Sequence, residues 1–130
     1  MMKLIFILLP LLCLASCSNS EEDNFGEATT IEAETVYSFD DVMEGEIVKV
    51  TFEVKNTGKI PLTIVDVKPA CGCTVAEFTK EPVLPGETAF IKSELNTSGM
   101  FGDVTKSITM MANTYPTRTP FMIKGNVLRN

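Results

Sequence analysis

The chain has 130 residues, a formal net charge of −6 at pH 7 and no histidine. This length is enough for one small domain with a single core. The acidic charge argues against a nucleic-acid partner, because neutralising phosphates requires clustered Lys and Arg side chains. Without histidine, a Ser or Cys nucleophile would lack its usual base, so we expect no enzyme and no catalytic residues.

Residues 1–16 have the features of a bacterial lipoprotein signal peptide. Lys3 precedes an apolar run over residues 4–14, which is shorter than the roughly 20 apolar residues that span a bilayer. The run ends in Leu14-Ala15-Ser16-Cys17, which is similar to a lipobox. In that pattern the small residues fit the signal peptidase, and the thiol of Cys17 receives the lipid. An ordinary signal peptide, cut at another position, is the alternative.

Lipid chains on Cys17 would anchor the mature chain in a membrane, since each buried methylene contributes about 0.8 kcal/mol. Residues 17–30 are expected to form a flexible tether, because the stretch after Cys17 is polar and acidic. Acidic residues at this place also resemble the surface-export signal of some Gram-negative lipoproteins. We therefore predict a lipoprotein of the outer membrane, either on its periplasmic face or at the cell surface.

Strand-like runs recur along the chain after residue 30, with turn residues between them. This spacing predicts an all-β domain over residues 31–130, namely a sandwich of seven or eight strands. In the clearest run, Ile47–Lys55, alternate apolar residues predict one buried face and one wet face. The residues of the predicted buried face are Val48, Val50, Phe52 and Val54.

The first and last runs set the expected ends of the sandwich. Ile31–Val36 is predicted to form the first strand. The last strand contains Phe121 and Ile123 in phase. Pro116 and Pro120 precede that phase, and they indicate that the last strand has an exposed edge.

Two turns and one irregularity are also predicted. Gly58 is expected to supply a positive φ in the turn after Ile47–Lys55. The apolar pattern of Leu62–Lys68 slips near Val65, which predicts a β-bulge. Pro85-Gly86 fits the two central positions of a type II turn.

An acidic cluster surrounds a predicted turn at Gly45. Carboxylate oxygens can bind calcium, but the spacing here fits no calcium-binding loop with ligands arranged around a central glycine. We therefore interpret the cluster as a solvated loop. Its acidic residues are Asp40, Asp41, Glu44 and Glu46.

Five motifs are distributed along the predicted domain. They are Phe52-Glu53-Val54-Lys55-Asn56-Thr57-Gly58, Pro61-Leu62-Thr63-Ile64, Cys71-Gly72-Cys73-Thr74, Pro85-Gly86 and Ile123-Lys124-Gly125-Asn126-Val127. Together they resemble a bacterial family known as domain of unknown function 1573. The resemblance implies an immunoglobulin-like sandwich, related to Hydin-type and major-sperm-protein-type domains, on an exported lipoprotein. It implies no established activity, and it singles out only Cys71 and Cys73 as site residues.

Cys71-Gly72-Cys73-Thr74 holds the two cysteines of the predicted domain. In an extended strand their Cα atoms would lie about 6.6 Å apart on one face. A disulfide therefore requires the backbone to turn at Gly72, which glycine permits. Such a small ring would be strained and reducible. Three interpretations stay open: a structural pair that is buried or locally bridged, a redox-active disulfide, and a metal site.

A metal site at this pair would suit Cu(I). The two thiols would supply soft ligands from one face, with Met110 or Met111 as a further ligand. A zinc site needs four ligands, so it would have to borrow carboxylates or a second chain. We expect no cofactor, with Cu(I) at Cys71 and Cys73 as the alternative.

The sequence thus leads to two hypotheses about function. The first is a non-enzymatic, lipid-anchored protein of the cell envelope that binds an unknown protein or glycan partner through a sheet edge or loops. The second is a thiol protein that uses Cys71 and Cys73 for copper binding or disulfide redox chemistry. The two hypotheses differ in whether these cysteines are exposed together or split between core and surface.

Overall fold

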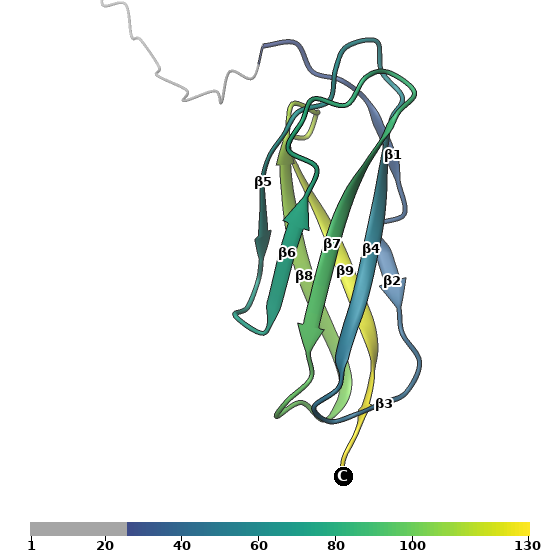
Figure 1. Cartoon of the computed structure of the whole chain (residues 1–130), viewed down its shortest axis with the longest axis vertical. Helices are drawn as coiled ribbons and strands as arrows, with labels where there is room; N and C mark the ends of the chain where they lie inside the picture. The colour runs from purple at the N-terminus through teal and green to yellow at the C-terminus, as the bar shows by residue number, and fades with distance from the viewer. Residues whose placement is uncertain (1–25) are drawn as a thin grey trace, which may run out of the picture.

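Residues 26–130, the part of the chain that the computed structural model describes, form a sandwich of two β-sheets (Figure 1). The strands of this region are β1 (Ile31–Ala33), β2 (Val36–Ser38), β3 (Val42–Met43), β4 (Ile47–Asn56), β5 (Ile64–Pro69), β6 (Thr74–Phe78), β7 (Thr88–Asn96), β8 (Gly102–Ala112) and β9 (Arg118–Leu128). One sheet has the order β1-β4-β7-β6, and the other has the order β2-β9-β8-β5 with β3 beside β9. The predicted all-β sandwich is confirmed.

The predicted signal segment (residues 1–16), the predicted lipidation site Cys17 and most of the predicted tether lie outside the described residues. Within residues 26–130, no helix has the length and apolarity needed to cross a bilayer. The chain packs onto the domain just before β1, at Thr29. The side chain of Thr29 is buried, and its amide donates a hydrogen bond of 2.8 Å to the carbonyl of Asn113.

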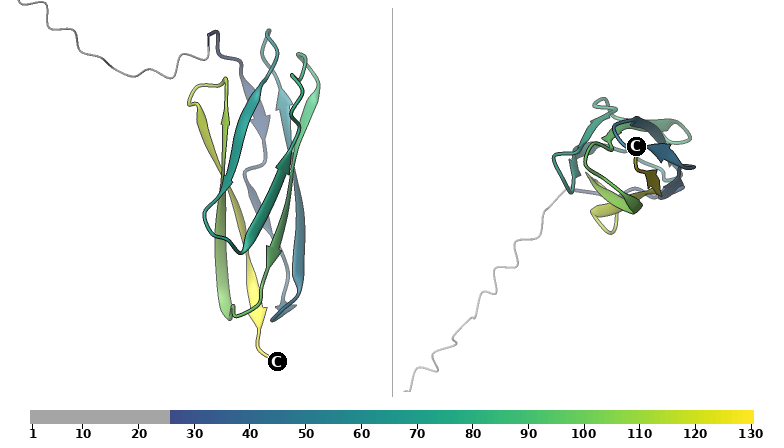
Figure 2. Two further views of the ribbon diagram at one scale, coloured as in Figure 1. Left: turned by 60° about the vertical axis from the view of Figure 1, so that its left-hand side comes forward. Right: turned by 90° about the horizontal axis from the view of Figure 1, so that it is seen from below.

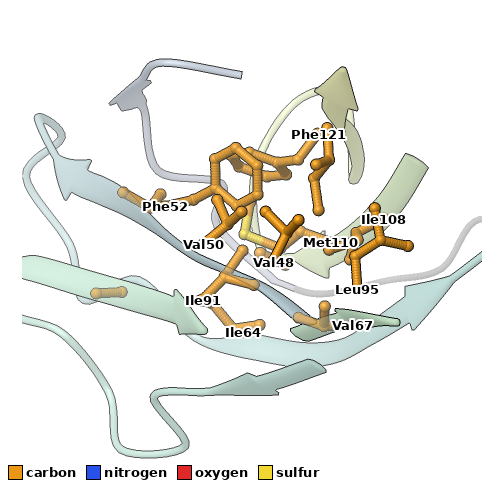
Figure 3. Packing of buried hydrophobic residues seen from close by; sticks show 14 of the residues in the cluster. Val48, Val50, Phe52, Ile64, Val67, Ile91, Leu95, Ile108, Met110 and Phe121 are labelled. Atoms are coloured by element: carbon orange, nitrogen blue, oxygen red, sulfur yellow. The ribbon is translucent and has the colours of Figure 1, made fainter. Parts of the chain in front are cut away.

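The core lies between the two sheets and is built by alternate residues of the long strands. Along β4 the burial alternates strictly, as the sequence predicts. The buried residues of this strand's core face are Val48, Val50, Phe52 and Val54. The ring of Phe52 meets that of Phe121 from the opposite sheet, with centroids 4.9 Å apart (Figure 3). Apolar packing between strands of different sheets therefore holds the sandwich together.

The predicted first strand, Ile31–Val36, is wrong as a single element. Residues of β1 pair antiparallel with β4, whereas β2 pairs parallel with β9 in the other sheet. The chain changes sheets at Glu34-Thr35, and the carbonyl of Thr35 accepts a hydrogen bond of 2.7 Å from the amide of Met122. This split and the two-residue β3 bring the described region to nine strands, more than the predicted seven or eight.

The prediction of an exposed edge on the last strand is also wrong for most of β9. This strand lies between β8 on one side and β2 and β3 on the other. Pairing with β2 begins only at Met122, so Pro120 occupies the part of β9 that has β8 as its one strand partner. Pro120 therefore lies where β9 has no strand on the side away from β8, so the predicted edge is limited to this short stretch.

The two remaining local predictions on the β5 to β7 region are confirmed. The register between β5 and β8 shifts between Ile64 and Asp66, which places a bulge at Val65. Gly86 has a φ of 84°, and the amide of Glu87 donates to the carbonyl of Leu84 at 3.0 Å. Those are the features of a type II turn with Pro85 and Gly86 at its centre.

A buried asparagine organises the turn after β4. The side-chain amide of Asn56 donates to the carbonyls of Ile60 at 2.8 Å and Val83 at 2.9 Å. Its Oδ1 accepts hydrogen bonds from the Thr29 hydroxyl at 2.8 Å and from the Gly58 amide at 3.1 Å. One fully buried side chain thus joins the start of the domain to two separate loops.

The expected positive φ of Gly58 is wrong, because Gly58 is not among the positive-φ glycines of residues 26–130. The reason for glycine is close approach instead. A Cβ at this position would overlap the Thr29 hydroxyl and would lie 2.8 Å from the amide nitrogen of Thr30. Glycine therefore lets the turn pack against the segment that enters the domain.

Candidate functional site

The connection between β5 and β6 carries the Cys71-Gly72-Cys73-Thr74 motif. Because β5 and β6 belong to different sheets, this connection crosses the side of the sandwich (Figure 1). The amide of Ala70 donates to the carbonyl of Ser107 on β8 at 2.9 Å, and the carbonyl of Cys73 accepts from the amide of Asn96 on β7 at 2.9 Å. Each end of the crossing is therefore tied to a different sheet.

Cys71 and Cys73 are joined by a disulfide, with Cα atoms 5.3 Å apart. This separation is shorter than the extended-strand value of about 6.6 Å, because the chain turns here. The amide of Thr74 closes the turn by donating to the carbonyl of Cys71 at 3.4 Å. Both cysteines are half-buried, and Cys73 packs against the core. The pair is thus neither split between core and surface nor fully exposed.

Gly72 does not turn the chain in the way that glycine alone permits. It is absent from the glycines of residues 26–130 that have a positive φ, and a Cβ built on it meets no atom within 4 Å. Neither backbone conformation nor space in the described structure requires glycine at this position. The turn that permits the bridge therefore does not depend on glycine, contrary to the expectation from the sequence.

Thr74 also belongs to the site, although its residue type alone predicts no role there. Its side chain is buried, and its hydroxyl oxygen lies 3.8 Å from Cys71 Sγ and 3.9 Å from Cys73 Sγ. A hydroxyl is a weak hydrogen-bonding partner for sulfur at these distances. The adjacency of Thr74 to Cys73 was visible in the sequence, but its contact with both sulfurs depends on the turn.

The structure does not bring the proposed methionine ligands to the cysteines. Met110 is the register partner of Val67 and Met111 that of Asp66, whereas the cysteine crossing starts beside Ser107. Three or four residues along β8 correspond to about 10–13 Å. Both sulfurs of Cys71 and Cys73 are also used in the disulfide. Within residues 26–130, no group of three or more His, Cys, Asp or Glu side chains could hold a metal.

Carboxylates of the acidic cluster around Gly45 accept hydrogen bonds from loops and a strand at one end of the sandwich. Glu46 Oε2 accepts a hydrogen bond from the amide of Met43 at 3.3 Å, and Glu44 Oε1 accepts one from the amide of Gly99 at 3.1 Å. Asp41 Oδ1 accepts from the side-chain amide of Asn126 at 3.0 Å. These carboxylates are therefore held in place by backbone and side-chain donors of the neighbouring loop and strand.

Solved structures that resemble this chain share its sandwich fold. A protein of unknown function from Porphyromonas gingivalis W83 matches with a TM-score of 0.67 and 17% identity, over 77% of this chain and 47% of that chain. The VesB protease of Vibrio cholerae matches with a TM-score of 0.62 and 12% identity, over 74% of this chain and 31% of that chain. This chain thus spans less than half of either protein, and the likeness shows the fold alone.

A third similar structure is the ASH/PapD-like domain 7 of human CEP192, with a TM-score of 0.58 and 10% identity. This match covers 100% of this chain and 99% of that chain. It supports the immunoglobulin-like character of the sandwich. No curated protein matches this chain.

The sequence motifs around Asn56 and the two cysteines lie on one continuous domain, and a family model covers that domain. The model described as "Protein of unknown function (DUF1573)" matches residues 30–127, from just before β1 almost to the end of β9. The family resemblance predicted from the motifs is thereby confirmed. The chain belongs to the DUF1573 family of proteins of unknown function.

Proposed function

We propose that this protein is a non-enzymatic, lipid-anchored module of the cell envelope that binds a protein or glycan partner. The Leu14-Ala15-Ser16-Cys17 motif supports the anchor. The chain joins the domain at one end of the sandwich, where Thr29 packs beside Asn113. This supports the binding role, because the other end is left free for a partner. The other end, where β8 begins at Gly102, is about 35 Å away at ~3.3 Å per residue.

The proposed anchor would keep the domain close to the membrane. The segment from Cys17 to Thr29 can extend over at most about 40 Å, at ~3.3 Å per residue. The tether would therefore hold the end of the domain near Thr29 within about 40 Å of the lipid and leave the end near Gly102 free to project away from it. A partner in the surrounding compartment would meet the projecting end first.

The chemistry of the domain favours binding over catalysis. The chain contains no histidine, and the buried polar side chains Asn56 and Thr97 are engaged with backbone groups of loops. Their hydrogen bonds stabilise the fold, so they are not available to a substrate.

The anchor and the partner are tested together in cells. Wild-type protein should fractionate with membranes and carry acyl chains on Cys17 by intact mass spectrometry, whereas Cys17→Ser should not. Cys13→Ser is the matched control, because Cys13 leaves with the signal peptide. Mild crosslinking of the native lipoprotein, followed by mass spectrometry, should recover a partner. An unlipidated wild-type chain, or a lipoprotein without a crosslinked partner, would contradict the proposal.

A second candidate function is thiol–disulfide exchange, and the half-buried position of Cys71 and Cys73 favours it. A partner dithiol would give two electrons and two protons to this disulfide, leaving two thiols here and a disulfide on the partner. Cu(I) binding would need the same reduced pair. In buffers of graded dithiol potential, a redox protein should exchange while folded, and its reduced form should be assayed for Cu(I). A bridge that opens only when the domain unfolds would exclude this function.

A further inference from the structure

The end of the sandwich farthest from Thr29 is formed by three segments that are distant in sequence. They are β3 with the turn after it, the β7–β8 loop and the end of β9. Thr97 joins two of them: its hydroxyl donates to the carbonyl of Glu46 at 2.7 Å and accepts from the amide of Gly45 at 3.0 Å. The amide of Glu44 donates to the carbonyl of Leu128 at 2.8 Å. We call this end, seen from below in Figure 2, the distal tip.

Three large apolar side chains are exposed at the distal tip. Met43 and Leu128 are register partners on β3 and β9. Their sequence neighbours Val42 and Val127 pack into the core, so Met43 and Leu128 face outward on the same side. Phe101 directly precedes Gly102, the β8 partner of Val127, and its ring contacts the guanidinium of Arg129, the residue after Leu128. Phe101 therefore lies beside the end of β9.

These three side chains are too exposed to belong to the hydrophobic core. Phe101 is 63% exposed, Leu128 40% and Met43 37%. Scattered apolar residues on a surface are ordinary, but exposed apolar residues that three segments bring to one end of the domain form a candidate interaction surface. An aromatic side chain such as Phe101 is among the kinds that contribute most to protein–protein binding.

Carboxylates lie within or directly beside the segments of the distal tip. They are Asp40, Asp41, Glu44, Glu46 and Asp103. Asp41, Glu44 and Glu46 are already fixed by the hydrogen bonds described above. Because these charges are held in place before any partner arrives, their ordering costs little when a partner binds. Negative charge around an apolar centre is complementary to a positively charged partner.

We propose that the distal tip binds a protein segment in which an apolar side chain is flanked by Lys and Arg. This inference rests on the proposed function and names the surface and the chemistry of the partner. The apolar side chain would pack on Met43, Phe101 and Leu128, and the flanking cations would face the tip carboxylates. An anionic membrane is a poor occupant, because it would meet like charge at the tip and because the anchor joins the opposite end.

Arg129 already shows how a cation sits on this surface. Its guanidinium carbon lies 4.6 Å from the centroid of the Phe101 ring, in a cation–π contact. A partner Arg or Lys would compete for the same ring. Replacing Arg129 by Gln therefore removes both a competitor and a like charge, and should tighten binding of a basic partner.

The direct test is a peptide titration with the full lipoprotein in nanodiscs of neutral lipid. The probe is a fluorescent peptide with Leu and Phe flanked by Lys and Arg, and its matched forms carry Glu for the basic residues or Ser for the apolar ones. Fluorescence anisotropy should show binding of the basic apolar peptide alone. The affinity should fall as salt is raised.

Variants locate the binding. Phe101→Ser and Asp103→Lys should each weaken binding about tenfold or more, whereas Arg129→Gln should strengthen it. Tyr115→Ser and Glu81→Lys are the matched controls, because Tyr115 is 93% exposed on the β8–β9 connection at the opposite end. Circular dichroism would check that each variant is folded.

Several outcomes would overturn the inference. They are equal binding of the acidic peptide, no binding of the basic peptide, or equal loss with Phe101→Ser and Tyr115→Ser. Each of them leaves the proposed anchored module intact if the native lipoprotein is acylated and crosslinks to a partner elsewhere on the domain. Failure of acylation or of partner capture would instead reject the proposed function, whatever the peptides do.

Discussion

The Thr29 hydroxyl donates a hydrogen bond of 2.8 Å to Oδ1 of Asn56, and both side chains are buried. This bond links the segment that enters the domain to the end of β4. The same asparagine also holds the carbonyls of Ile60 and Val83. The end of the sandwich that faces the proposed anchor is therefore fastened by one polar side chain.

Asn56→Ala should lower the free energy of unfolding by about 2–4 kcal/mol, because it leaves several buried groups without partners. Asn96→Ala is the control: its Oδ1 accepts one exposed hydrogen bond, from the amide of Ser98 at 2.9 Å. That change should cost about 0.5 kcal/mol. Denaturant melts of both variants check the difference, and equal losses would show that the Asn56 network is unimportant.

Phe52→Ala should cost about 3–5 kcal/mol, because it removes a buried ring that packs on Phe121 across the sandwich. Glu53→Ala, on the wet face of the same strand, should cost under about 0.5 kcal/mol. The same denaturant melts measure both values. A Glu53→Ala variant as unstable as Phe52→Ala would contradict the assigned faces of β4.

Two glycines should respond oppositely to the same substitution. Gly58→Ala places a methyl group against the Thr29 hydroxyl and the Thr30 amide, so it should destabilise the domain by about 1–3 kcal/mol. Gly72→Ala meets no atom within 4 Å and should change the stability by less than about 0.5 kcal/mol. Thermal melts of the pair suffice. Tolerance of Gly58→Ala would mean that the entering segment does not pack closely on this turn.

Ser93 is the one described residue with a buried side-chain oxygen or nitrogen that lacks a hydrogen-bond partner. Its removal in Ser93→Ala should therefore leave the stability unchanged or raise it by about 1 kcal/mol. Thr97→Ala is the contrasting change, because it removes a buried hydroxyl that bonds to Gly45 and Glu46. It should lower the free energy of unfolding by about 1–3 kcal/mol. Marked destabilisation by Ser93→Ala would show that this hydroxyl has a partner.

The double change Cys71→Ser and Cys73→Ser should leave the domain folded. A bridge between residues two apart closes a very short loop, so it restricts the unfolded chain little. The expected loss is under about 2 kcal/mol. Alkylation with mass spectrometry would show the bridge in the wild type, and melts would give the loss. Global unfolding of the double variant would mean that the bridge holds the crossing between the sheets.

The strict alternation of β4 could be predicted because every second residue of a half-buried strand contacts the core. The change of sheets at Glu34-Thr35 could not, since three residues of β1 and three of β2 carry too little periodicity to assign each to a sheet. The reason for glycine at position 58 could not be predicted from the sequence either. A glycine required by close approach to Thr29 has the same sequence signature as one required by a positive φ.

The cysteine pair and the distal tip also differ in how far the sequence predicts them. The bridge between Cys71 and Cys73 could be considered from the sequence, because the two residues are only two positions apart. The distal tip joins Met43, Phe101 and Leu128, whose proximity depends on pairing between distant strands. No local pattern around any one of them indicates that they share a surface.

Site-specific photo-crosslinking in intact cells tests the anchored binding module most directly. A photoreactive amino acid would replace Phe101 in one strain and Tyr115 in another, each with Cys17 intact. We expect position 101 to crosslink to one dominant protein through a segment with an apolar residue between Lys and Arg, and position 115 to give far less of that product. Equal crosslinking from both positions, or crosslinks from position 101 that persist unchanged in the Cys17→Ser form, would contradict this description of the molecule.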